Sequence, residues 1–164
     1  MEKHQNEIHA YLWRLLEDSQ DAQDVLQETF LRAYRAYDQL NHGEKARPWL
    51  YRIATRSAYT ALQRRRSRAE RSLPLLDEHP DGRPSPSEQM EHQDLVGRVR
   101  SAVRSLPDRQ RSALLLRKYQ EMSYEEIGRA LGCTPEAARA HVYQALRRLR
   151  ARFPAQAEQE RGGR

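Results

Sequence analysis

Apolar residues recur at the spacing of an α-helix in two separate blocks of the chain. In the first block, three stripes at intervals of three and four residues begin at Ile8, Val25 and Trp49. Stripes of this kind predict amphipathic helices that bury one face. A polar segment, residues 41–48, contains Gly43 and interrupts the pattern before the third stripe. The first block is therefore expected to form a small bundle of three or four helices.

The second block has the local signals of a helix-turn-helix. Ser123 and Glu126 have the spacing of a capping box, and Gly132 suits the left-handed position that ends a helix. Thr134 and Pro135 suit the start of the next helix. A short helix, a tight turn and a basic second helix form the geometry that enters the major groove of DNA. The second helix is expected to bury Ala138, Val142, Ala145, Leu146 and Leu149.

The segment between the two blocks predicts a linker. Residues 72–87 contain four prolines, a density that prevents a continuous helix. A single domain with so long a surface loop is the less common alternative. We therefore expect an all-α fold of two small helical domains, a three-to-four-helix bundle and a helix-turn-helix domain, joined by a flexible linker. The expected boundaries are 1–71 and 97–155 for the domains, 72–96 for the acidic linker and 156–164 for a disordered tail.

The distribution of charge points to nucleic acid. The chain has 29 Lys and Arg against 23 Asp and Glu, and residues 97–164 alone carry 15 basic and 7 acidic residues. A concentration of positive charge on a helical domain favours contact with phosphates. On the other face of the third predicted helix, Arg52, Arg56 and Tyr59 interleave cations with an aromatic ring, a combination that suits single-stranded nucleic acid. Trp49 at the start of that helix is either part of this surface or part of the core.

Other classes of function lack their usual signals. No run of about 18 apolar residues is present, which predicts no membrane insertion. The first ten residues are polar and charged, which does not resemble a signal peptide. The single cysteine, Cys133, allows no intramolecular disulfide, and the six histidines show no metal-ligand spacing. These features predict a cytoplasmic protein that is not an enzyme and needs no cofactor.

Several segments together resemble the bacterial sigma factors, in particular the extracytoplasmic-function (group four) class. Residues 21–34, DAQDVLQETFLRAY, resemble the helix of sigma domain two, and residues 48–54, PWLYRIA, resemble the promoter-melting segment after it. Residues 123–128, SYEEIG, and 145–150, ALRRLR, resemble sigma domain four. The resemblance implies a factor that binds core RNA polymerase and directs promoter recognition and DNA opening for a stress- or envelope-responsive regulon.

The same resemblance implies a role for each surface. The face of the second helix would bind the clamp helices of the largest core subunit, domain four would bind the flap of the second largest subunit, and an anti-sigma factor would be a further partner. The implied core-binding residues are Asp21, Asp24, Gln27, Glu28, Arg32 and Arg35. The implied residues for the −10 element are Asn41, His42, Arg47, Trp49, Arg52, Arg56, Tyr59, Arg64 and Arg65. The implied residues for the −35 element are Ser123, Thr134, Glu136, Arg139, Ala140, Tyr143, Gln144, Arg147 and Arg148.

Two other functions are alternatives to this interpretation. A stand-alone helix-turn-helix transcriptional regulator would explain the second block but would leave the basic surface of the third predicted helix without a role. A nucleic-acid-processing enzyme would need clustered carboxylates, a metal motif or a nucleophile with its base, and the sequence has none of these patterns.

Overall fold

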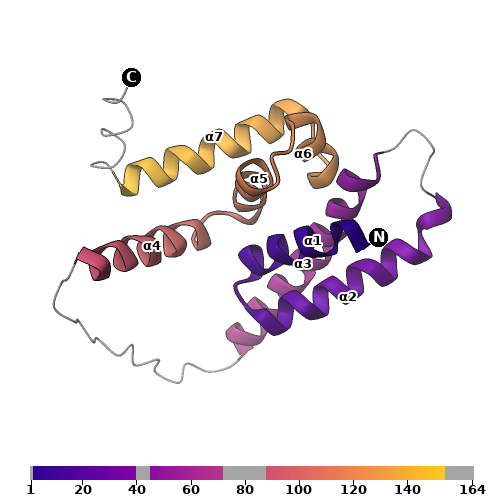
Figure 1. Ribbon diagram of the computed structural model, residues 1–164, viewed down its shortest axis with the longest axis horizontal. Helices are drawn as coiled ribbons and strands as arrows, with labels where there is room; N and C mark the ends of the chain where they lie inside the picture. The colour runs from indigo at the N-terminus through magenta and orange to yellow at the C-terminus, as the bar shows by residue number, and fades with distance from the viewer. Residues whose placement is uncertain (1, 40–44, 72–87, 154–164) are drawn as a thin grey trace.

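The computed structural model describes residues 2–39, 45–71 and 88–153, and every regular element within these ranges is helical (Figure 1). The N-terminal bundle consists of α1 (Glu2–Leu16), α2 (Ser19–Arg35) and α3 (Ala46–Arg71), with a short 3₁₀ turn, η1 (Tyr37–Gln39). The C-terminal bundle consists of α4 (Glu88–Arg104), α5 (Asp108–Tyr119), α6 (Tyr124–Leu131) and α7 (Pro135–Arg152). The predicted all-α architecture of two helical units is confirmed.

The three helices of the N-terminal bundle pack on one another through the stripes that the sequence predicts. The side chain of Asp18 caps α2 by accepting a hydrogen bond of 2.8 Å from the backbone N–H of Asp21. From α2, Val25 and Leu26 point into the core, where they join Leu12 of α1 and Leu62 of α3. Burial of this apolar surface is the main force that holds the three helices together.

The C-terminal bundle is built around α7, which packs against α5 and α6 and more lightly against α4. Helix α7, the second helix of the helix-turn-helix, buries Ala138, Val142 and Ala145, as predicted. Leu146 and Leu149 of the same helix are half-buried against Leu106 and Leu114. One boundary differs from the sequence prediction: α4 begins at Glu88, so residues 88–96 are helical rather than part of a linker. The other predicted linker residues, 72–87, and the predicted tail, 156–164, lie outside the described residues.

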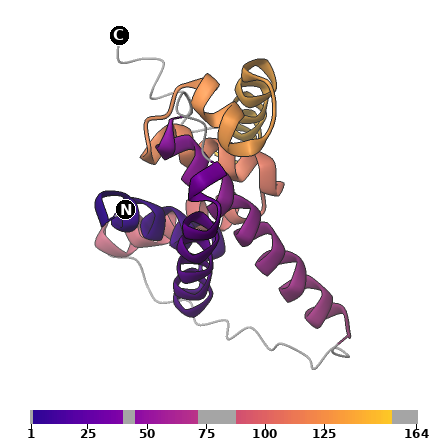
Figure 2. The same cartoon turned by 90° about the vertical axis from the view of Figure 1, so that its right-hand side faces the viewer.

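The two bundles lie against each other rather than apart. Helix α3 packs on α6, and α1 packs on α5 (Figure 1). A single apolar cluster runs through this interface, with Ile8 and Leu50 from the N-terminal bundle and Leu116, Met122 and Ile127 from the C-terminal bundle. The C-terminal end of α3 projects beyond the other helices (Figure 2).

Candidate nucleic-acid and polymerase interfaces

Local hydrogen bonds fix the turn between α6 and α7. Ser123 and Glu126 form a reciprocal capping box, with distances of 3.2 and 3.0 Å between each side chain and the backbone nitrogen of the other residue. Gly132 has a φ of +65°, the left-handed conformation that glycine adopts without strain. Thr134 then accepts a hydrogen bond from the backbone of Ala137 and starts α7. These features confirm the predicted helix-turn-helix.

Gly128 brings α6 against the turn that follows it. A Cβ atom at this position would lie only 2.7 Å from the carbonyl oxygen of Cys133. The same close approach lets the backbone N–H of Cys133 donate a 2.9 Å hydrogen bond to the carbonyl of Gly128. The angle between α6 and α7 therefore depends on the absence of a side chain at Gly128.

The predicted −35 residues of α7 share one exposed face. This face is opposite the buried Ala138 and Val142, so it is the side of the helix that is open to solvent. Ser123 and Thr134 lie at the helix starts, where their side-chain oxygens serve as caps. The exposed members of the face are Glu136, Arg139, Ala140, Tyr143, Gln144, Arg147 and Arg148.

Tyr124 is a residue of this surface that sequence reasoning missed. Its ring lies between two cations, 5.0 Å from the guanidinium carbon of Arg117 and 5.1 Å from that of Arg139. The ring also lines a groove of about 390 Å³ between α6 and α7, beside Pro135 and Tyr143. The sequence gives little signal for this role, because Tyr124 is the first residue of α6 and its spacing does not reveal that it contacts Arg117 and Arg139.

The predicted −10 residues of α3 divide between a covered and an open part. Arg56 and Arg64 are exposed, and Arg52 is half-buried. Trp49, in contrast, is only 7% exposed and belongs to the apolar core, which is the core position that the sequence left open for it, so a contact of its ring with bases stays a prediction. The physical reason for its burial is that the start of α3 packs on α6, which no local pattern reveals. Asn41 and His42 lie outside the described residues.

Three other predicted −10 residues have partners within the chain. Arg47 donates from Nε to Glu7 at 3.2 Å and from Nη2 to the carbonyl of Gln120 at 3.0 Å. The hydroxyl of Tyr59 donates to Oγ of Ser112 at 3.0 Å. Arg65 donates to the carbonyl of Leu16 at 3.1 Å and pairs with a carboxylate oxygen of Asp21 at 3.4 Å.

The predicted polymerase-binding residues lie on the outer face of α2. Asp24, Gln27, Glu28, Arg32 and Arg35 are exposed, and Asp21 is half-buried. Arg32 donates to Glu28 at 2.6 Å along this face.

A groove of about 460 Å³ separates α2 from α3, and it brings two predicted surfaces together. Its α2 side includes Asp21, Asp24 and Glu28, and its α3 side includes Arg64 and Arg65. Candidate polymerase-binding acids and candidate DNA-binding arginines therefore share one surface.

Two further findings concern the described residues only. Within residues 2–39, 45–71 and 88–153, no group of three or more His, Cys, Asp or Glu side chains is placed to hold a metal ion. Within the same part of the chain, no helix combines the length and the apolar character that crossing a membrane requires.

Comparison with known proteins identifies both bundles. Two family models match the chain, Sigma-70 region 2 over residues 1–68 and Sigma-70, region 4 over residues 97–149. The RNA polymerase sigma-H factor of Pseudomonas aeruginosa is 32% identical over 151 residues, which cover 87% of this chain and 78% of that protein. The ECF RNA polymerase sigma factor SigE of Mycolicibacterium smegmatis is 33% identical over 90% of this chain and 58% of its own length.

These matches place the chain among the sigma-70 proteins that carry region 2 and region 4. The chain belongs to the extracytoplasmic-function class of RNA polymerase sigma factors, and it acts in promoter-directed transcription initiation. The match to region 2 excludes a stand-alone helix-turn-helix regulator, which would have no such domain.

Two solved structures share the fold. One is the sigma factor RpoE in complex with the anti-sigma factor NepR from Bartonella quintana, with a TM-score of 0.67 and 22% identity over 90% of this chain and 89% of that chain. The other is CnrH in complex with the cytosolic domain of CnrY, with a TM-score of 0.67 and 23% identity over 93% of this chain and 84% of that chain.

Proposed function

We propose that this sigma factor reads the −35 element with the exposed face of α7 and engages the −10 region with α3. The observation that carries the proposal is the division of α7 into a buried apolar face and an exposed face with Arg139, Arg147 and Arg148. A recognition helix needs this division, because one face must pack on its own domain while the other reaches base edges and phosphates.

The exposed arginines of α3 have a different task in this proposal. Arg56 and Arg64 are exposed on α3, which suits contact with a phosphate backbone. They would hold the non-template strand after the duplex opens. Flipping a base of the −10 element costs a few kcal/mol of unstacking, and contacts with the opened strand offset this cost.

Protein partners follow from the remaining surfaces. The charged outer face of α2 would bind the clamp helices of the largest subunit of core polymerase, and the C-terminal bundle would bind the flap of the second largest. The two solved structures with this fold contain anti-sigma factors, which supports an anti-sigma partner for this chain as well. We further propose that the protein works in the cytoplasm, that it catalyses no reaction of its own and that it needs no cofactor.

The experiment that tests the proposal is promoter-selective run-off transcription with purified core polymerase. Arg139→Ala should change the preference among −35 sequences by about 1–3 kcal/mol if Arg139 contacts a base. Arg147→Ala should instead weaken all sequences alike and reduce the salt dependence by about one phosphate contact. Arg152→Ala, at the end of α7 and outside the proposed face, is the matched control. Equal behaviour of all three variants would contradict the assignment of this face.

The α3 surface needs a separate measurement. Arg56→Ala combined with Arg64→Ala should leave binding to core polymerase intact and reduce open-complex formation, which permanganate footprinting detects. A promoter with a pre-melted −10 region should restore activity. A normal footprint in the double variant would show that these arginines do not hold the opened strand.

A further inference from the structure

Gln110 of α5 holds one of the side chains on the proposed −35 face of α7. Its own side chain is only 8% exposed, and its Nε2 donates a 2.9 Å hydrogen bond to Oε1 of Gln144, an exposed residue of that face. Gln110 was given no role by the sequence patterns. The structure therefore connects a buried glutamine of one helix to a candidate DNA contact on another.

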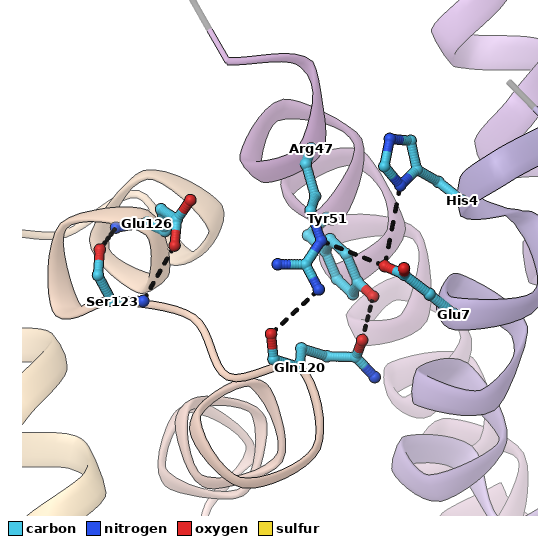
Figure 3. A network of polar contacts seen from close by, with 7 residues as sticks. All are labelled: His4, Glu7, Arg47, Tyr51, Gln120, Ser123 and Glu126. Atoms are coloured by element: carbon cyan, nitrogen blue, oxygen red, sulfur yellow. Dashed lines mark hydrogen bonds and ion pairs between the residues drawn. The ribbon is translucent and has the colours of Figure 1, made fainter.

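The other end of the Gln110 amide has no partner. Its Oε1 atom is buried, and no donor within the described residues reaches it. Gln120 is also buried, but its Oε1 accepts a 2.7 Å hydrogen bond from the hydroxyl of Tyr51 (Figure 3). A buried carbonyl oxygen without a donor reduces stability, because it has lost its hydrogen bonds with water. An apolar side chain of similar length would fill the position of Gln110 without this loss.

The packing of α5 on α7 does not depend on the bond between the two glutamines. Leu114 of α5 and Ala145 of α7 belong to one buried apolar cluster, against which Leu146 and Leu149 pack. Burial of this apolar surface is enough to join the two helices. Because Gln144 is exposed, water is able to satisfy its amide as well as Gln110 does. The effect of the bond therefore lies in the orientation of the Gln144 amide rather than in stability.

This orientation decides what Gln144 presents to a base. A glutamine amide accepts hydrogen bonds with its oxygen and donates them with its NH2 group. The two atoms project from the same carbon in different directions, so the bond from Gln110 to Oε1 turns Nε2 of Gln144 away from α5. In the major groove, guanine offers the acceptors N7 and O6 to such a donor, whereas cytosine offers the donor group N4.

We propose that Gln110 is a positioning residue for promoter recognition, which fixes the NH2 group of Gln144 toward DNA and so makes Gln144 select guanine over cytosine. The inference rests on the proposed function of α7, and it adds a specificity determinant that does not itself touch DNA. The orphaned Oε1 fits this role, since only a polar side chain is able to set the direction of an amide. The ring of Tyr124 holds Arg139 of the same face in a comparable way, at 5.1 Å.

The test measures the base preference of the full-length protein bound to core polymerase. The template is a promoter library with a randomised −35 region, in which each promoter is linked to a barcode downstream of its start site. Counting the barcodes in run-off transcripts gives the preference at every position. Gln144→Ala identifies the position that Gln144 reads, because the preference there is lost. Wild-type protein should favour guanine over cytosine at that position by at least about fivefold, the lower limit for a good base contact.

Gln110→Met removes the polar atoms of the side chain and nearly keeps its length. The Gln144 amide is then free to turn, so the ratio of guanine to cytosine should fall toward one. The Tm should equal that of the wild type or exceed it by up to about 4 °C, because the orphaned carbonyl is gone. A purely structural role of Gln110 would instead lower the Tm and leave the ratio unchanged. Gln20→Met, at an exposed position of α2, is the matched control and should change neither value.

Gln110→Glu tests the direction of the amide. An ionised carboxylate only accepts hydrogen bonds, so at about pH 8 the Gln144 amide must turn its NH2 group toward residue 110 and present Oε1 to DNA. The ratio should then invert in favour of cytosine, whose N4 group donates to that oxygen. If the buried carboxylate prevents folding, Gln110→Met still decides the inference.

The outcomes separate this inference from the proposed function. A guanine-to-cytosine ratio that stays at the wild-type value in Gln110→Met, while Gln144→Ala removes it, would overturn the inference. A wild-type preference for cytosine at that position would overturn it as well. If Arg139→Ala alters the −35 preference and Gln144→Ala does not, the inference is wrong but the proposed function of α7 remains. If neither variant alters the preference, the proposed function of α7 itself is contradicted.

Discussion

Replacing Gly128 by valine tests the contact on which the helix-turn-helix depends. A Cβ atom at Gly128 would lie 2.7 Å from the carbonyl oxygen of Cys133 and 3.3 Å from backbone atoms of both Thr134 and Pro135. Because all three neighbours are backbone atoms, the turn would have to move as a unit. Overpacking of this kind costs about 1–3 kcal/mol, and the better helix propensity of valine returns only a few tenths.

Gly97 provides the matched control for this substitution. It lies within α4, and no described atom comes within 4 Å of the position that its Cβ would occupy. Gly97→Val should therefore leave stability unchanged or raise it slightly, through helix propensity alone. Thermal unfolding followed by far-ultraviolet circular dichroism should show a Tm for Gly128→Val that is roughly 2–10 °C below that of the wild type.

The pair of variants also separates stability from recognition. Displacement of α7 by Gly128→Val should weaken binding to a −35 duplex even at temperatures where the protein is folded, whereas Gly97→Val should not. Equal Tm values for the wild type and Gly128→Val would refute the argument that backbone contact at Gly128 sets the angle between α6 and α7. A loss of stability in Gly97→Val as large as that in Gly128→Val would refute it as well.

The remaining predictions concern the side chains of Tyr124, Cys133, Tyr51 and Tyr59. Tyr124→Leu should weaken −35 binding by the roughly 0.5–1 kcal/mol of an exposed cation–π contact, whereas Tyr124→Phe should retain it because the ring over Arg139 remains; fluorescence anisotropy with a −35 duplex measures both. Burial raises the pKa of the Cys133 thiol, so alkylation by iodoacetamide at pH 8 should be slower in the folded protein than in urea. Burial also raises the pKa of Tyr51 and of Tyr59 above the value near 10 of an unfolded tyrosine. Because the unfolded chain then loses these protons first, urea titrations should show stability falling as the pH rises above about 10, and Tyr51→Phe should reduce that dependence.

Elements with local signals could be predicted from the sequence. The capping box of Ser123 and Glu126, the left-handed Gly132 and the cap at Thr134 all act within four residues, so a short segment contains the whole cause of each. The apolar stripes of α1, α2 and α7 likewise appear in the order and on the faces that their spacing predicts, because burial of one face determines how such a helix packs.

Features that depend on contacts between distant segments could not be predicted. Trp49 has the same spacing whether it faces DNA or the core, and only the packing of α3 on α6 decides that it is buried. Arg111 stands in a polar stretch, residues 108–112, as a surface arginine would, yet it is buried and donates a hydrogen bond to the carbonyl oxygen of Arg14 inside the interface. The start of α4 at Glu88 was obscured by acidic residues that resemble the composition of the preceding segment.

The first part of α3 is held by apolar packing, whereas its C-terminal part is rich in arginine and is held by ionic contacts. The buried apolar positions of α3 end at Leu62, so the rest of the helix has no apolar core to pack on. Arg65 and Arg66 still bond to neighbouring helices, and the end of α3 projects beyond them (Figure 2). Like charges repel along such a segment, and Asp21 of α2 offsets part of that repulsion through Arg65. The acids of α2 and the arginines of α3 therefore stabilise each other in the free protein. A partner that binds either set of charges alters the field at the other, so the proposed polymerase-binding and DNA-binding surfaces of the N-terminal bundle cannot be electrostatically independent.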